Sequence, residues 1–346
     1  MSALGRIALS REYTCGPDGG SFPADGTLGI DGSVTSQARR LATLAGVRQP
    51  FAKAQQLLAE LCGWTLDDET IRLLTHAAAK QATVERPKRA DAARFAAASG
   101  EIEVPIDAGK VNTREGWRDV KIALVCRRNA GEPATPAEWD ERTLPAPTIR
   151  TVIAAIEDSE RFATRVRAEA DRLDVTTAAT VTVLGDGAEW IWNLAEEVFP
   201  QAEGVLDVYH ALEHVGDAVT AVWGDGAEAT VAHREAGRRA LIADGKAGFE
   251  RWLATTFATV PEGVATDPLI AAAAYLAKHP TRLNYAERLA AGRSIGSGAV
   301  EGAVKQLINL RLKRTGARWR ADHVGPLVEL IAFSETPDWN DFWTAA

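Results

Sequence analysis

The pattern of hydrophobic and polar positions changes near residue 100 and separates a helical part of the chain from a part with strands. Between residues 34 and 98, "PFAKAQQLLAELCGW" predicts one amphipathic helix and "TLDDETIRLLTHAAAK" begins another. Thr65 and Asp68 have the spacing of a capping box at the start of the second helix. The turn at Gly63 fits either a DNA-binding helix-turn-helix or a plain helical hairpin, and the acidic start of the second helix favours the hairpin.

Beyond residue 100 the pattern predicts strands. Two alternating runs over residues 102–113 and 117–128 precede a linker over residues 129–147 that is rich in Pro, Ala and Glu. A third strand is expected in "TIRTVIAAIED" and a fourth in "ATVTVLGD", each followed by a helix, and "GVLDVYHALEHV" begins as a fifth. Residues 216–293 are helical in pattern, and a final helix is expected from about Ser297 through Leu312.

This order of elements predicts the fold class. Three consecutive strands can form an antiparallel meander, and strands separated by helices extend it as a mixed sheet. The order is that of the ribonuclease-H-like fold, an α/β class with a mixed five-stranded sheet and flanking helices, here with an all-α insertion before the last helix and a helical N-terminal region. The expected parts are a loop-rich segment over residues 1–33, a helical region over 34–98, a catalytic core over 99–215 and 294–335, and a helical insertion over 216–293.

Composition excludes several classes of protein. The chain has 346 residues, of which 46% are hydrophobic and 25% charged, as in ordinary soluble proteins. No apolar run is long enough to span a bilayer, and the start of the sequence lacks the apolar core of a signal peptide. Cys15, Cys62 and Cys126 are too scattered for a disulfide framework, so a reducing cytoplasm is expected.

Charge gives a mixed indication about nucleic acid. The net charge of −8 speaks against a nucleic-acid partner, because phosphate binding depends on Lys and Arg. The stretch over residues 302–321 nevertheless contains no acidic residue. With Trp319 among them, its cations fit a DNA backbone with one stacked base, although a solvated helix end is the simpler alternative. The expected DNA-contacting residues are Lys305, Arg311, Lys313, Arg314, Arg318, Trp319 and Arg320.

Three carboxylates stand at positions that the expected topology could bring together. Asp107 lies in the first strand, Asp186 ends the fourth, and Glu301 is in the first turn of the last helix. If the first and fourth strands are neighbours, the final helix could deliver Glu301 beside both aspartates. Such a cluster would repel itself without cations, and two Mg²⁺ ions could both neutralise it and carry out phosphoryl transfer. Taken singly, Asp186 also fits a helix N-cap, Asp107 a turn, and Glu301 the helix dipole.

Three blocks of the sequence resemble one family. "GDGAEWIWNLAEEVFPQAEGVLDVYHALEHV" and "IGSGAVEGAVKQLINLRLKRTGARW" resemble the ISKra4-type insertion-sequence transposases, which are DDE enzymes distantly related to the Mutator-like group. "DAGKVNTREGWRDVKIALV" resembles the first catalytic strand of that family and the strand after it. The resemblance covers roughly residues 9–335 and implies Asp107, Asp186 and Glu301 as the catalytic, metal-binding triad.

The resemblance also implies cofactors and partners. These are two Mg²⁺ or Mn²⁺ ions per site, terminal inverted repeats and target DNA, a homodimer or larger assembly on DNA, and the bacterial cytoplasm at the nucleoid. Members of the family usually begin with a longer region that includes a Cys-rich, zinc-binding segment. Here Cys15 remains but Asp18 stands where a second cysteine is expected, so the sequence does not predict structural zinc. The alternative is a catalytically inactive or repurposed DNA-binding relic of a transposase.

The segment "DVYHALEH" carries two auxiliary candidates. Asp207 and His210 resemble the [CD]-x-x-H motif of related transposases, with His210 near a phosphate, the nucleophile or the metal carboxylates. A packed His210 hydrogen-bonded to Asp207 is the alternative. His210, Glu213 and His214 also form H-x-x-E-H, a zinc-peptidase signature with Glu287 as a further ligand. That motif needs a helix, whereas the pattern puts it at the end of a strand.

Overall fold

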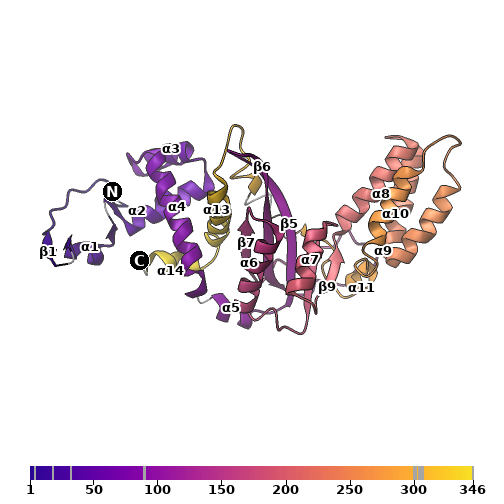
Figure 1. The fold of residues 1–346 in the computed structure, drawn as a ribbon, viewed down its shortest axis with the longest axis horizontal. Helices are drawn as coiled ribbons and strands as arrows, with labels where there is room; N and C mark the ends of the chain where they lie inside the picture. The colour runs from indigo at the N-terminus through magenta and orange to yellow at the C-terminus, as the bar shows by residue number, and fades with distance from the viewer. Residues whose placement is uncertain are drawn as a thin grey trace.

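The computed structural model of the chain describes most of its residues, and Figure 1 shows their arrangement. Glu301 and Lys305 lie outside the described residues, as does most of the final helix expected between Ser297 and Leu312. Within the described part, every helix is too short or too polar to cross a membrane. The described residues are 1–3, 5–17, 19–31, 33–88, 91–298, 302 and 308–344.

A mixed five-stranded sheet lies at the centre of the structure (Figure 1). Its order is β7-β6-β5-β8-β9, with β5, β6 and β7 antiparallel and β5, β8 and β9 parallel. The first three strands form the antiparallel meander that the sequence allowed, and the first and fourth strands are neighbours, as the carboxylate hypothesis requires. The strands are β5 (Glu101–Thr113), β6 (Gly116–Arg128), β7 (Ile149–Ala155), β8 (Val181–Gly185) and β9 (Glu203–Leu206).

Helices cover both faces of the sheet. On one face, α6 (Ser159–Arg172) and α7 (Glu189–Val198) pack their apolar sides against strand residues such as Ile106. On the other face lies α13 (Ala321–Phe333), so close to β7 that a Cβ at Gly325 would come within 2.6 Å of the Ala154 carbonyl oxygen. Neither α13 nor the short α14 (Asp338–Thr344) was expected from the sequence pattern.

The N-terminal helices dock on α13. They are α2 (Ser36–Arg48), α3 (Phe51–Cys62) and α4 (Asp68–Glu85), and α4 shares an apolar cluster with α13. Asp67 caps α4 by accepting the Thr70 amide at 2.6 Å. The capping box expected at Thr65 is therefore wrong, because Asp67 stands directly before the helix. The smaller elements are β1 (Thr14–Gly16), β2 (Gly19–Ser21), α1 (Pro23–Leu28), β3 (Ile30–Asp31), β4 (Val34–Thr35), η1 (Arg86–Lys88) and α5 (Asp91–Ala97).

The helices between β9 and residue 290 continue the core of the sheet. A single apolar cluster runs from Val183 in β8 to Leu241 and Leu276 in these helices. The expected linker over residues 129–147 packs on these helices beside the first turn of α8, where its Trp139 is buried against Tyr209, and the amide of Gly131 donates to the Gly292 carbonyl at 2.9 Å. The helices are α8 (Val208–Trp223), α9 (Glu228–Phe257), α10 (Asp267–Ala277) and α11 (Tyr285–Ala290), and α9 is kinked at Asp244 and Gly245.

Candidate functional site

The pairing of β5 with β8 brings two of the expected carboxylates together. In this parallel pair Pro105 lies opposite Leu184. Continuing the register by two residues puts Asp107 level with Asp186, where β8 has ended and β5 runs on. Both side chains are partly exposed. Because parallel strands end at the same edge of a sheet, the two carboxylates share that edge.

The local geometry explains how each aspartate is held. Oδ1 of Asp186 accepts the amide of Ala188 at 2.8 Å and so stabilises the turn into α7. Oδ1 of Asp107 accepts the amide of Ala108 at 2.6 Å. The N-cap alternative for Asp186 is wrong, because α7 begins at Glu189 with Ala188 as its N-cap; Asp186 instead stabilises the preceding turn and uses only one of its oxygens to do so.

Tyr275 of α10 lies beside the turn at Asp186 and is itself stacked against a histidine. A Cβ at Gly187 would meet the ring of Tyr275 at 2.2 Å, so only glycine lets α10 approach this turn so closely. His214 of α8 stacks on Tyr275 with ring centroids 3.7 Å apart. Burial and, next, the charge of Asp186 raise the pKa of Tyr275 to about 12, so its phenol stays protonated at neutral pH.

Tyr275 is a site residue that the sequence pattern did not predict. Nothing in the apolar pattern of "DPLIAAAAYLA" distinguishes it from a core residue. The available signal was Gly187, since a glycine directly after a carboxylate at a strand end permits a close approach of another element.

Asp207 holds the chain just before the segment that carries Glu301. It is fully buried at the end of β9, and its Oδ1 accepts the amides of Tyr209 at 2.8 Å and His210 at 3.1 Å. Its Oδ2 accepts the hydroxyl of Ser297 at 2.7 Å and also the Ser297 amide. Both oxygens are therefore occupied by donors from two elements, which gives Asp207 a positioning role.

The side chain of His210 has a different partner from the one considered in the sequence. Its Nδ1 lies 3.5 Å from Oε2 of Glu213, whereas only its backbone amide bonds to Asp207. The alternative in which the ring is bonded to Asp207 is therefore wrong. His210 is 38% exposed, so its ring remains accessible beside the start of α8.

The H-x-x-E-H motif lies wholly within a helix. Because α8 begins at Val208, the expectation that the motif straddles a strand end is wrong. His214 nevertheless has its ring stacked on Tyr275. Among the residues that the structure describes, no three His, Cys, Asp or Glu side chains are grouped to hold a metal, and Glu301 is not among those residues.

The basic segment divides into buried and exposed residues. Arg311 is only 4% exposed; its Nε donates to the Gly46 carbonyl in the last turn of α2 at 2.9 Å. Its guanidinium lies 4.7 Å from the ring centroid of Phe51 and 5.0 Å from that of Trp319. Burial lowers the pKa of Arg311 to about 10. Arg311 thus joins the N-terminal helices to the core, in place of the DNA contact expected from the sequence.

Trp319 is also engaged inside the protein. Its Nε1 donates to the Leu312 carbonyl at 3.0 Å, and its ring packs edge-on against Phe51. The ring is partly exposed, so the base stacking expected from the sequence stays a prediction. The expected DNA-contacting residues that are exposed are Lys313, Arg314, Arg318 and Arg320.

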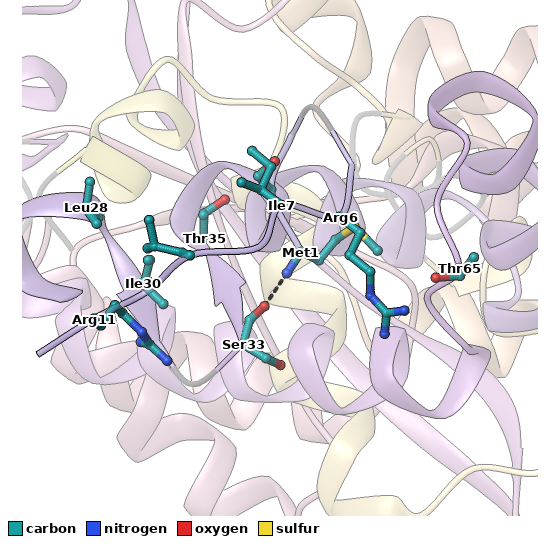
Figure 2. A pocket seen from close by; sticks show the side chains of 11 residues that line it. Met1, Arg6, Ile7, Arg11, Leu28, Ile30, Ser33, Thr35 and Thr65 are labelled. Atoms are coloured by element: carbon teal, nitrogen blue, oxygen red, sulfur yellow. Dashed lines mark hydrogen bonds between the residues drawn. The ribbon is translucent and has the colours of Figure 1, made fainter. Parts of the chain in front are cut away.

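A cavity of about 540 Å³ lies among the N-terminal residues, as Figure 2 shows. It is lined mainly by residues between Met1 and Thr35, with Thr65 from the turn before α4. The amine of Met1 donates to the Ser33 carbonyl at its edge. None of the carboxylates at the sheet edge lines this cavity, so the candidate site is the open edge at Asp107 and Asp186.

Comparisons with known proteins found no relative of this chain: no protein-family model matches it, and no curated protein matches its sequence. What the sheet edge offers is a pair of carboxylates on adjacent strands and a buried aspartate that fixes the approach of a third segment. Carboxylate oxygens at such an edge suit a hard divalent cation.

Proposed function

We propose that the chain is a DNA transposase of an insertion sequence with a ribonuclease-H-like core. It hydrolyses phosphodiester bonds at the ends of the element and transfers the freed 3′-hydroxyls to target DNA. The observation that carries the proposal is the β5–β8 register, which puts Asp107 level with Asp186. The sheet order β7-β6-β5-β8-β9 supports the fold, and the three sequence blocks that resemble ISKra4-type enzymes support the family.

Asp107 and Asp186 are the proposed metal ligands, with Glu301 as the third. Two partly exposed carboxylates level with each other on neighbouring strands fit divalent cations, because neighbouring negative charges are stabilised by a cation between them. When bound, two Mg²⁺ or Mn²⁺ ions supply activation of the attacking oxygen and stabilisation of the leaving oxygen. Asp207 holds Ser297, which precedes Glu301 by four positions in the sequence, through two hydrogen bonds. The neutral phenol of Tyr275 provides a hydroxyl beside Asp186 for a phosphate oxygen.

Cleavage of DNA that carries the element's ends tests the proposal. Asp186→Asn should lower Mg²⁺- or Mn²⁺-dependent cleavage by at least about 100-fold, since even changes to residues behind metal ligands cost 10- to 100-fold. DNA affinity measured without metal should stay close to that of the unaltered protein. The matched control is Asp217→Asn, which removes the same charge from an exposed position of α8.

Each other outcome has a defined meaning. Cleavage that survives in Asp186→Asn contradicts the assignment of the triad. DNA binding without cleavage in either metal would identify an inactive relic. Stoichiometric zinc that is lost in His210→Ala and His214→Ala would instead support the peptidase reading, since the motif lies in a helix.

A further inference from the structure

A two-stranded arm extends from the sheet beside the candidate site. β8 pairs only with Ile102–Pro105 of β5, and β7 pairs only with Lys121–Arg127 of β6. The rest of the long β5–β6 hairpin therefore runs past its neighbours, as Figure 1 shows. We call residues 109–120 the hairpin arm. Its turn is closed at Gly116, whose φ of +102° is readily adopted only by glycine.

One face of the arm is packed and its end is braced. Val111 and Val120 are fully buried. Trp319 forms a parallel β-bridge with the arm. Its backbone amide donates to the Asn112 carbonyl at 3.0 Å, and its carbonyl accepts the Arg114 amide at 2.8 Å. The contacts of Trp319 with Phe51 and Arg311 extend this support to the N-terminal helices. The tip of the arm, at its turn, is therefore a rigid surface.

The opposite face of the arm carries the exposed Trp117, with Lys110 and Asp119 on the same face, whereas Arg118 is paired with Val111 and so lies on the other face. Trp117, opposite Asn112, is 59% exposed. Two exposed acids, Glu115 and Asp119, lie on the arm, and Asp322 is paired with Arg320. The cations outnumber these acids in a chain whose net charge is −8. The exposed cations are Lys110, Arg114 and Arg118 on the arm and Lys313, Arg314 and Arg318 on the adjoining segment.

We infer that the tip of the hairpin arm binds a DNA strand, with its cations on phosphates and Trp117 stacked on an unpaired base. Bases within a duplex are already stacked on each other, so an exposed ring on a rigid strand suits a base that has left the duplex. The cations beside it supply the sequence-independent part of the binding. The inference rests on the proposed function and names a DNA contact outside its carboxylate centre.

The arm contact is separate from the carboxylates. Asn112, the partner of Trp117, is five residues beyond Asp107 on β5. At about 3.4 Å per residue this is about 17 Å, or about five nucleotides of a stacked strand. Because this separation is an odd number of residues, Trp117 and Asp107 lie on opposite faces of the hairpin, so a strand held at the tip passes around the edge of the arm and lies several nucleotides from the bond to be cut.

Fluorescence anisotropy with two labelled probes, each in EDTA, tests the inference without cleavage. The probes are single-stranded dT20 and a hairpin-capped duplex of random sequence. Trp117→Ala should weaken dT20 binding about 5- to 100-fold, by the usual worth of one base–aromatic stack, and duplex binding less than about twofold. Trp117→Phe, which keeps a ring, should stay within about threefold of the original protein on dT20.

Two double variants test the proposed contacts between the cations of the arm and DNA phosphates. Arg118→Ala with Arg314→Ala should weaken binding of both probes and reduce the dependence on salt by about 0.7 to 0.9 per cation lost. The control is Arg161→Ala with Arg239→Ala, which removes two exposed arginines from α6 and α9, with side chains 79% and 68% exposed. It should leave the salt dependence nearly unchanged.

The outcomes separate this inference from the proposed function. If Trp117→Ala binds dT20 as well as the original protein, or if the control pair loses as much affinity as the arm pair, the arm site is wrong while the transposase proposal stands. If the original protein binds neither probe, the arm site and the transposase proposal are both wrong. Thermal unfolding of each variant, compared with the original protein, excludes misfolding as the cause of a loss.

Discussion

At the scale of single residues, three aspartates lie on three adjacent strands, Asp107 within β5 and the other two directly after β8 and β9, but they differ in what surrounds them. Asp107 and Asp186 are partly exposed, whereas Asp207 is fully buried and receives four hydrogen bonds. The sequence predicted the neighbouring positions of the first two, because strand ends and glycines are visible in the pattern. It could not reveal the contact of Asp207 with Ser297, which joins residues 90 positions apart.

Asp207→Asn tests this positioning contact. An asparagine retains an oxygen for the α8 amides, but its NH2 group meets the two donors of Ser297. The free energy of unfolding should fall by about 2 to 3 kcal/mol, because buried donors are left without an acceptor. Cleavage should fall with it, while DNA affinity in EDTA is retained. Urea denaturation and the cleavage assay measure the two effects.

The control for this variant is Asp158→Asn. Asp158 caps α6 by accepting one hydrogen bond, from the Arg161 amide at 2.8 Å, and its side chain is 59% exposed. Its replacement should change the free energy of unfolding by less than about 1 kcal/mol. Equal losses in the two variants would show that Asp207 acts only as a helix cap.

At the scale of elements, the hydrophobic pattern predicted the helices that have one solvent-exposed face. It did not predict helices that are buried on both sides. Helices α3 and α6 have exposed sides, and their periodicity predicted them. In contrast, α13 is buried between the sheet and α4, so its sequence "ADHVGPLVELIAF" is apolar on most sides and lacks a clear period. For the same reason, the internal roles of Arg311 and Trp319 follow from a distant partner, Phe51, and not from their own segment.

The packing of α10 on the turn after β8 can be tested at Gly187. Its φ is not in the left-handed region, so alanine fits the backbone, and the obstacle is the ring of Tyr275 at 2.2 Å from the added Cβ. Gly187→Ala should therefore lower the free energy of unfolding by about 1 to 3 kcal/mol, the usual effect of overpacking.

A double-mutant cycle isolates this contact. In a Tyr275→Ala background the ring is gone, and Gly187→Ala should cost less than about 0.5 kcal/mol. Urea denaturation of the four proteins gives the coupling energy directly. Additive losses would mean that the turn itself, and not Tyr275, requires glycine.

At the scale of the whole molecule, neutral histidines lie at two junctions with the sheet region. His76 of α4 faces His323 of α13 with ring centroids 4.1 Å apart, and burial and then His323 lower its pKa to about 4. His279, which follows α10, contacts Trp192 of α7, and burial and then Arg282 lower its pKa to about 4. Both junctions therefore depend on imidazoles that are uncharged at neutral pH.

Acid should weaken these junctions, and His76→Phe tests the first. The folded pKa of about 4 is below the ordinary 6.5, so the unfolded chain binds the proton more readily. The stabilisation is complete above about pH 6.5 and is lost as the pH falls toward 4. Phenylalanine keeps a ring and cannot titrate. The fall in unfolding free energy between pH 7 and 4.5 should thus be smaller in the variant, by on the order of 1 kcal/mol after solvent screening.

Urea denaturation at pH 8.5, 7 and 4.5 measures the unfolding free energy of both proteins. The two values should change in parallel between pH 8.5 and 7. Equal changes below pH 7 would contradict a neutral His76 at this junction.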